Sequence, residues 1–104
     1  MNTLMVNAEH GTTGVWLDGA PVDDLCALGF SGELNADFHK WSTRFTDLSL
    51  SIVDDSYDPR WIQFNQDGRE LAKRLKRECK ERFKVECRYY ADNSYEQTTE
   101  VLIP

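Results

Sequence analysis

The residues best suited to metal binding or nucleophilic catalysis are three cysteines and two histidines. Cys26, Cys79 and Cys87 form no Cys-x-x-Cys pair, and His10 and His39 form no His-x-x-x-His pair. Zinc sites in proteins use closely spaced ligands of these kinds. A serine or cysteine nucleophile needs a histidine base beside it, and neither histidine has an evident nucleophile in the sequence. We therefore expect no catalytic residue, no metal site and no cofactor, and the chain is not predicted to be an enzyme.

Carboxylates are the more unusual group. Three aspartates and a tyrosine fall within five positions, and two further aspartates are adjacent. The candidate partner-binding residues are Asp54, Asp55, Tyr57, Asp58, Asp23 and Asp24. In one interpretation these are the turn formers and helix cap of a polar loop. In the other they form a surface where carboxylates meet Lys or Arg of a partner and the tyrosine anchors the contact. The sequence leaves both open.

The charge along the chain is uneven. Residues 1–58 carry ten acids and two bases, residues 59–90 carry ten bases and five acids, and the last fourteen residues add three acids. The net charge is −6 and the pI is about 4.8. A field of this sign opposes the approach of a polyanion. Direct binding of nucleic acid is therefore not expected, and neither is binding of a membrane or a small-molecule substrate. If the carboxylates form a binding surface, its partner is expected to be a basic protein.

The basic segment offers an alternative function. Arg69, Lys73, Lys76 and Lys80 are spaced 4, 3 and 4, which places them in one stripe of a helix. A nucleic-acid-binding or regulatory module could use such a stripe over residues 60–82. Three opposite-charge pairs at i, i+4 favour a solvated, self-compensated face instead. These pairs are Glu70 with Arg74, Arg77 with Glu81, and Glu78 with Arg82.

The elements that must position these residues follow from periodicity. Alternation predicts strands at residues 3–7 and 15–17, with Asp18-Gly19 as a turn, and Pro21 argues against a further strand directly after it. Apolar residues spaced 4, 3, 4 and 3 predict a helix over residues 32–47, capped by Ser31. Residues 49–58 are expected to form an exposed loop.

The second half predicts a helix and a hairpin. Asp58-Pro59 is a helix start, and Gly68 on the apolar stripe predicts a close approach to a neighbouring element. Alternation at 85–91 and 99–103 predicts two strands. The fold class is therefore α+β, a single domain over residues 1–104 in the order ββααββ. Its sheet is expected to be mostly antiparallel, with two helices packed on one face.

The expected centre of the core consists of large apolar residues and one glycine. They are Trp16, Phe38, Trp41, Trp61, Phe64, Gly68, Leu71 and Leu75. Cys79 and Cys87 also fall on apolar faces, and an odd number of cysteines is typical of free thiols in a reducing compartment. No signal peptide or apolar span is evident, so a cytoplasmic location is expected.

One pattern of residues resembles a known family. It consists of Gly14-Val-Trp-Leu-Asp-Gly19, Leu28-Gly-Phe-Ser31, Phe38-His-Lys-Trp41, Trp61-Ile-Gln-Phe-Asn65, Gly68, Leu71-Ala-Lys-Arg-Leu-Lys-Arg-Glu78 and the strand from Val85 to Tyr90. This pattern is similar to the small bacterial immunity proteins of polymorphic and contact-dependent growth inhibition toxin systems. Relatives often have a glycine after the second helix, where this chain has Cys79-Lys80-Glu81.

The resemblance implies a cytoplasmic inhibitor that binds one cognate toxin domain and blocks its active site or substrate surface. A nuclease toxin needs a basic surface for RNA or DNA, which an acidic inhibitor would complement. Because recognition residues vary among such proteins, the resemblance assigns no binding residue. The acidic candidates depend on charge and expected exposure alone.

Overall fold

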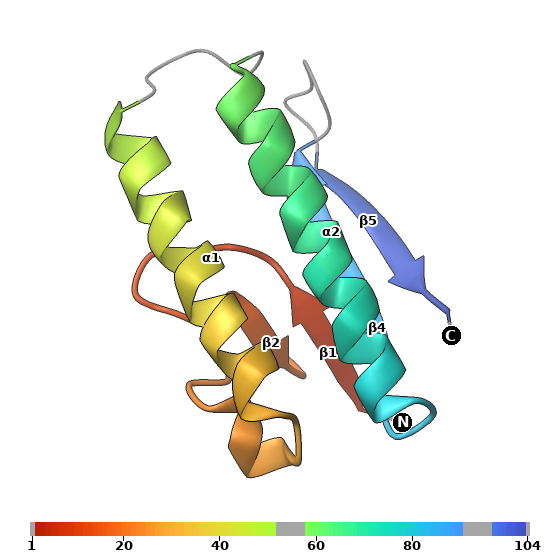
Figure 1. The fold of residues 1–104 in the computed structure, drawn as a ribbon. Coiled ribbons are helices and arrows are strands. Elements are labelled where there is room, and N and C mark those ends of the chain that lie inside the picture. Colours follow the sequence, from red (N-terminus) through yellow and green to blue (C-terminus); the bar gives the residue numbers. More distant parts are fainter. Residues whose placement is uncertain (1, 52–57, 91–96, 104) are drawn as a thin grey trace.

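The computed structural model describes residues 2–51, 58–90 and 97–103, in which two helices cover one face of a five-stranded sheet (Figure 1). The strands are β1 (Thr3–Val6), β2 (Val15–Leu17), β3 (Ala20–Pro21), β4 (Lys84–Tyr90) and β5 (Gln97–Leu102). A short 3₁₀ helix, η1 (Leu25–Leu28), precedes the helices α1 (Gly32–Ser51) and α2 (Pro59–Cys79). The α+β class predicted from the sequence is confirmed.

The sheet is mixed, with the strand order β3-β2-β1-β4-β5. Three neighbouring pairs are antiparallel, but β1 and β4 run parallel, with Leu4 opposite Val85 and Val6 opposite Cys87. The chain between β1 and β4 includes both helices, and a crossover of this kind is what a parallel pair requires. The predicted ββααββ order is therefore incomplete, because it lacks β3 and η1.

Pro21 does lie in a strand, contrary to the sequence-based expectation. Asp18 and Gly19 both have positive φ, at 48° and 88°, as the two-residue turn of a tight hairpin requires. This turn pairs Ala20 and Pro21 with β2. Proline is tolerated because β3 is an edge strand, where no ladder hydrogen bond is lost on its free side.

Helix α1 begins where the sequence predicted and ends later. The hydroxyl of Ser31 accepts the N–H of Leu34 at 3.2 Å, which confirms it as the N-cap. The predicted end at residue 47 is wrong, because the helix continues to Ser51. Within the extra turn, the Ser49 hydroxyl donates to the Phe45 carbonyl at 2.7 Å, so its polar side chain is satisfied inside the helix. Residues 49–51 of the expected loop therefore belong to α1, and residues 52–57 lie outside the described residues.

Helix α2 confirms the predicted start and the predicted close approach. Asp58 is its N-cap and Pro59 occupies its first turn. A Cβ placed on Gly68 would lie 2.5 Å from Cζ2 of Trp41, so only glycine lets the indole of α1 approach the backbone of α2. The Trp41 ring stacks on Phe64, with 4.6 Å between ring centroids, and donates its Nε1–H to the Phe64 carbonyl at 3.0 Å.

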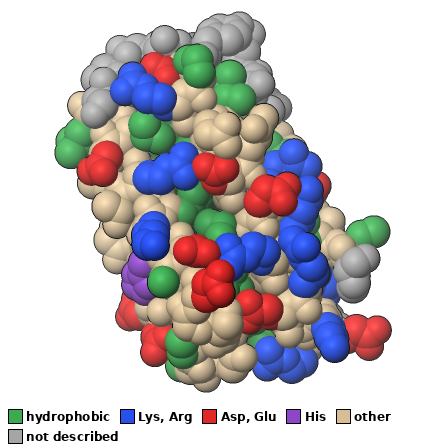
Figure 2. Space-filling view, viewed as in Figure 1, with side chains coloured by type: hydrophobic (Ala, Val, Ile, Leu, Met, Phe, Trp, Pro, Cys, Tyr) green, Lys and Arg blue, Asp and Glu red, His purple; other side chains and the backbone are tan. Residues whose placement is uncertain are grey.

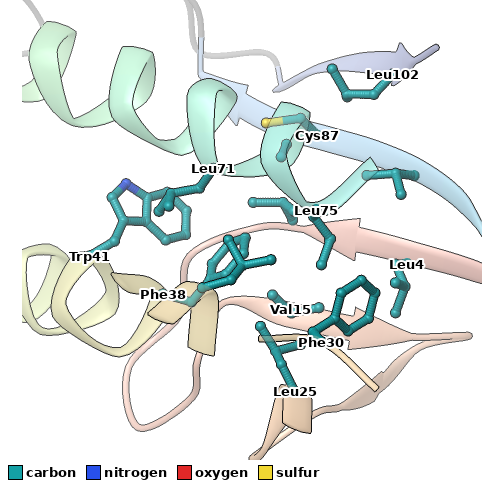
Figure 3. Packing of buried hydrophobic residues seen from close by; sticks show 14 of the residues in the cluster. Leu4, Val15, Leu25, Phe30, Phe38, Trp41, Leu71, Leu75, Cys87 and Leu102 are labelled. Carbon is teal, nitrogen blue, oxygen red and sulfur yellow. The ribbon is translucent and has the colours of Figure 1, made fainter. Parts of the chain in front are cut away.

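The core lies between the helices and one face of the sheet (Figure 3). Phe38 and Trp41 of α1 and Leu71 and Leu75 of α2 pack toward Leu4 and Val15 of the strands, and the buried cysteines are Cys79 and Cys87. Trp61 is half-buried at the margin of this cluster. The prediction that Trp16 belongs to the core is wrong. Because Val15 and Leu17 point toward the helices, Trp16 points to the opposite face of the sheet.

Candidate protein-binding surfaces

Asp58 acts as a helix cap. Its Oδ1 accepts the backbone N–H of Arg60 at 2.9 Å, and its carboxylate also pairs with the Arg60 guanidinium at 2.9 Å. These hydrogen bonds, that of the guanidinium first, lower the pKa of the Asp58 carboxyl. The neighbouring candidates Asp54, Asp55 and Tyr57 lie outside the described residues. Of the predicted acidic loop, the structure therefore describes only Asp58. Its role as a helix cap explains an aspartate at this position without a binding function.

The second predicted acidic pair lies elsewhere. Asp24 caps η1 by accepting the N–H of Cys26 at 2.9 Å, while Asp23 is exposed beside it. The N–H of Leu25 is bonded to the side chain of Asn35, which places both aspartates near the start of α1. Asp58 follows the other end of that helix, which is 20 residues or about 30 Å long. The structure does not bring Asp23 and Asp24 together with Asp58.

The predicted basic stripe on α2 is interrupted. Lys76 is only 8% exposed and donates its Nζ to the Phe83 carbonyl at 2.8 Å. Arg69 turns toward the sheet, where its guanidinium bonds both carboxylate oxygens of Glu100 at 2.8 and 3.2 Å. This pairing raises the pKa of Arg69 and lowers the pKa of Glu100. The four cations expected in one exposed stripe therefore do not form one.

The ion pairs of α2 also differ from the expected i, i+4 set. Arg74 reaches Asp37 of α1 at 2.8 Å, and Glu70 pairs with Lys73 at 3.0 Å. Glu78 instead accepts the N–H and hydroxyl of Ser31, so it secures the start of α1. Figure 2 shows acidic and basic side chains interspersed over the helix layer. Two cations of α2, Arg69 and Arg74, are thus compensated by carboxylates of other elements.

Acidic groups without such compensation occur in the first third of the chain. The first 39 residues contain no Lys or Arg. Five of their carboxylates take part in no ion pair within residues 2–51, 58–90 and 97–103. We call this set the acidic edge: Glu9, Asp18, Asp23, Asp24 and Glu33. Four members lie in the segments that connect β1, β2, β3 and η1, and Glu33 lies in the first turn of α1. The absence of bases before Lys40 was the sequence signal for it.

A polar hollow of about 340 Å³ lies beside α1 and contains Asp23, His39, Ser42 and Thr43 among its lining residues. Its hydroxyls are engaged in the fold: Ser42 donates to the Thr12 carbonyl, and Thr43 donates to the His39 carbonyl at 3.0 Å. No serine–histidine pair is formed in this lining. Its chemistry is that of a hydrogen-bonding surface.

The second hollow lies on the face of the sheet that the helices leave open. It has a volume of about 360 Å³ and is lined by Thr3, Met5, Asn7, Glu9, Trp16, Asp18, Gly19 and Arg88. The Trp16 Nε1–H donates to the Asn7 carbonyl at 2.9 Å, which fixes the indole over β1. Met5 and Trp16 are half-buried. Sequence reasoning missed this site, although strict alternation in β2 would have directed Trp16 away from Val15.

The thiols give no sign of a reactive site. Burial raises the pKa of Cys87 to about 12, so this side chain is a protonated core residue at neutral pH. All three cysteines are free, with Cys26 exposed, as the sequence predicted. Among the described residues, no three His, Cys, Asp or Glu side chains converge as metal ligands would, and neither helix is long and apolar enough to span a membrane.

Comparison with known proteins gives no assignment: no protein-family model, no curated protein and no solved structure matches this chain.

Proposed function

We propose that this protein binds a basic protein partner and neutralises it, and that the partner is a cognate bacterial toxin domain. In this proposal the protein is a cytoplasmic immunity protein without catalytic activity that protects the producing cell. The toxin is proposed to be a nuclease, because a nuclease must present cations to RNA or DNA. An inhibitor that covers such a surface gains association rate and specificity from negative charge.

The observation that carries the proposal is the acidic edge. The carboxylates of the helix layer and the cations of α2 largely compensate one another, for example in the pairs Arg69–Glu100 and Arg74–Asp37. The carboxylates of the acidic edge have no such partners within the described part of the chain. Negative potential is therefore concentrated beside β2 and β3, where a basic partner would be attracted.

Nucleic-acid binding through α2 has less support. Phosphate recognition needs several exposed cations in one stripe, whereas Lys76 is buried and Arg69 is paired with Glu100. The polar hollow beside α1 likewise offers little support for catalysis, because its serine hydroxyl donates to a backbone carbonyl.

The test is coexpression with the C-terminal domain encoded by the reading frame immediately upstream. We expect the two proteins to copurify and the cells to survive expression of that domain. Purified chain should inhibit the activity of the domain when mixed at equal concentration. Failure to bind the domain, together with failure to protect the cells, would contradict the proposed function.

The acidic loop predicted from the sequence is tested in the same assay. Reversing Asp54 and Asp55 to lysine should slow association with the toxin domain, because each reversal replaces attraction with like-charge repulsion. The matched control reverses Lys73 and Arg77, two exposed cations of α2, to glutamate. If the loop variant protects like wild type while the helix variant fails, α2 is the interface and the loop is not.

A further inference from the structure

We infer that the open face of the sheet, centred on Trp16 and Met5, is the docking surface for a basic protein partner. This inference deepens the proposed function, because it assigns the binding surface of the same partner. It is independent of the predicted loop at residues 52–57. It rests on one observation: the side chains of Trp16 and Met5 line the same hollow as the carboxylates of Glu9 and Asp18.

The register of the sheet places one apolar row across its open face. Trp16 pairs with Pro21 on one side and with Met5 on the other, Met5 is opposite Glu86, and Glu86 is opposite Val101. Four of the five residues in this row are apolar. Four gaps of about 4.8 Å make the row roughly 19 Å wide, enough for several side chains of a partner.

A row of apolar residues that are exposed or half-buried is unusual for the outer face of a sheet. The solvent face of an antiparallel sheet normally carries polar side chains. Here Val101 is 50% exposed, and Ile103, just beyond β5, is 82% exposed. The row is interrupted by Glu86, and apolar surface with a polar rim is typical of a protein-binding site. Tryptophan and methionine are enriched at such sites.

The charges around the hollow specify a cationic partner. Glu9 and Asp18 flank Trp16, and neither forms an ion pair within the described residues. Asp18 uses Oδ1 to accept the N–H of Thr3 at 2.9 Å, which leaves its second oxygen for a partner. Arg88 is the base in this lining, on the β4 side. Glu86 is neutralised by Lys84 at 3.0 Å.

An arginine or lysine of the partner fits this arrangement. Its aliphatic stem would pack on Met5 and the indole of Trp16, while its cation would meet Glu9 or Asp18 and the face of the ring. A polyanion would meet these carboxylates unfavourably, and so would the same face of a second copy. Carboxylates of the acidic edge lie next to the apolar row, on either side of β3. The negative potential that would attract the partner is therefore adjacent to the apolar contact surface.

The experiment measures binding of the full chain to the upstream-encoded toxin domain. The variant Met5→Lys/Glu9→Lys introduces two cations at the hollow and should weaken the Kd at least tenfold. Glu9→Lys alone alters an exposed side chain outside the secondary structure, and it should slow association about threefold or more. Urea denaturation confirms that each variant is folded.

Two control variants make comparable changes, a charge reversal and the loss of an apolar side chain, at positions away from the open face of the sheet. Glu81→Lys reverses an exposed charge after α2, and Leu50→Ser removes an apolar side chain that is 79% exposed at the end of α1. Both should bind within about threefold of wild type. Oxidative footprinting of wild type should also show Met5 and Trp16 protected in the complex.

The outcomes separate this inference from the proposed function. If wild type binds the toxin domain and the Met5→Lys/Glu9→Lys variant binds equally well, the sheet face is not the interface, although the function stands. If wild type does not bind, both proposals fail. If wild type is a dimer that Met5→Lys dissociates, the sheet face joins two copies, and the assignment to a basic partner is overturned.

Discussion

Replacing Gly68 with alanine tests whether the two helices are held together as the structure describes. Intrinsic helix propensity predicts stabilisation by about 1 kcal/mol, because glycine is the poorer helix former. Packing predicts the opposite. The new Cβ would lie 2.5 Å from Cζ2 and 2.9 Å from Cε2 of Trp41, well inside ordinary contact at 3.4 Å. The two effects have opposite signs, so their magnitudes decide the result.

The indole has little freedom to move away. On its other edge, a Cβ at Gly14 would already lie 2.7 Å from Cζ3, so the backbone there is also in close contact with the ring. Displacing the ring would disturb its stacking on Phe64, worth about 0.5–1.5 kcal/mol. It would also strain the hydrogen bond from Trp41 Nε1 to the Phe64 carbonyl, worth about 1 kcal/mol. Overpacking itself costs about 1–3 kcal/mol. Partial loss of the stacking and hydrogen bond offsets the propensity gain of about 1 kcal/mol, so we expect a net loss of about 1–3 kcal/mol.

Urea denaturation followed by circular dichroism measures this loss. With an m-value of about 1.5 kcal/mol/M, the midpoint should fall by about 0.7–2 M. Gly32→Ala is the matched control, because a Cβ there meets no atom within 4 Å, and its midpoint should stay or rise. In a Trp41→Phe background, which shortens the ring system, Gly68→Ala should cost less. A higher midpoint for Gly68→Ala in the wild-type background would refute the described helix packing.

Three further measurements test the core and its polar contacts. Leu75→Ala should lower the free energy of unfolding by about 2–5 kcal/mol in the same urea assay, since this side chain is fully buried. Hydrogen bonding from Arg69 lowers the pKa of Glu100 from its ordinary 4.5, so the pair should stabilise the fold above about pH 4.5 and lose this effect as pH falls through the lowered pKa. Glu100→Gln should abolish that part of the pH dependence in denaturation curves. A chromogenic disulfide reagent at pH 8 should modify exposed Cys26 in the folded protein and reach Cys87 only on unfolding, because burial raises the pKa of Cys87 to about 12.

The helices were the most predictable part of the fold. Their apolar period, the caps Ser31 and Asp58 and the glycine at position 68 all agree with the observed packing. Such signals are local, because each cap or stripe is completed within a few residues. The end of α1 was misjudged because Ser49 has its hydroxyl bonded within the helix, so a polar residue there does not signal a loop.

The sheet was less predictable because its pairing is long-range. Nothing near Thr3 or Lys84 in the sequence indicates that β1 and β4 are parallel neighbours, since that pairing depends on the path through both helices. Its large apolar side chain predicts a core position for Trp16. In a three-residue strand, however, the two faces are set by Val15 and Leu17, which point toward the helices. Residue type therefore predicts the wrong face of the sheet for Trp16, whereas alternation along β2 predicts the right one.

The position of uncompensated acidic and basic groups could be predicted only in part, because it also depends on long-range contacts. The sequence pattern pairs Arg74, Arg77 and Arg82 with carboxylates one helical turn away and places Arg69 in a cationic stripe. The structure pairs Arg69 with β5 and Arg74 with α1, because packing brings those carboxylates closer than the helix's own. These contacts reduce the basic character of α2, while Glu9, Asp18 and the rest of the acidic edge form no ion pair within the described residues. Tertiary ion pairs thus reduce the positive charge of α2, while the negative charge of the acidic edge beside β2 and β3 is not reduced. Trp16 lies on the open face between Glu9 and Asp18. The proposed attraction for a basic partner and the apolar contact proposed to hold it would therefore occur at one place.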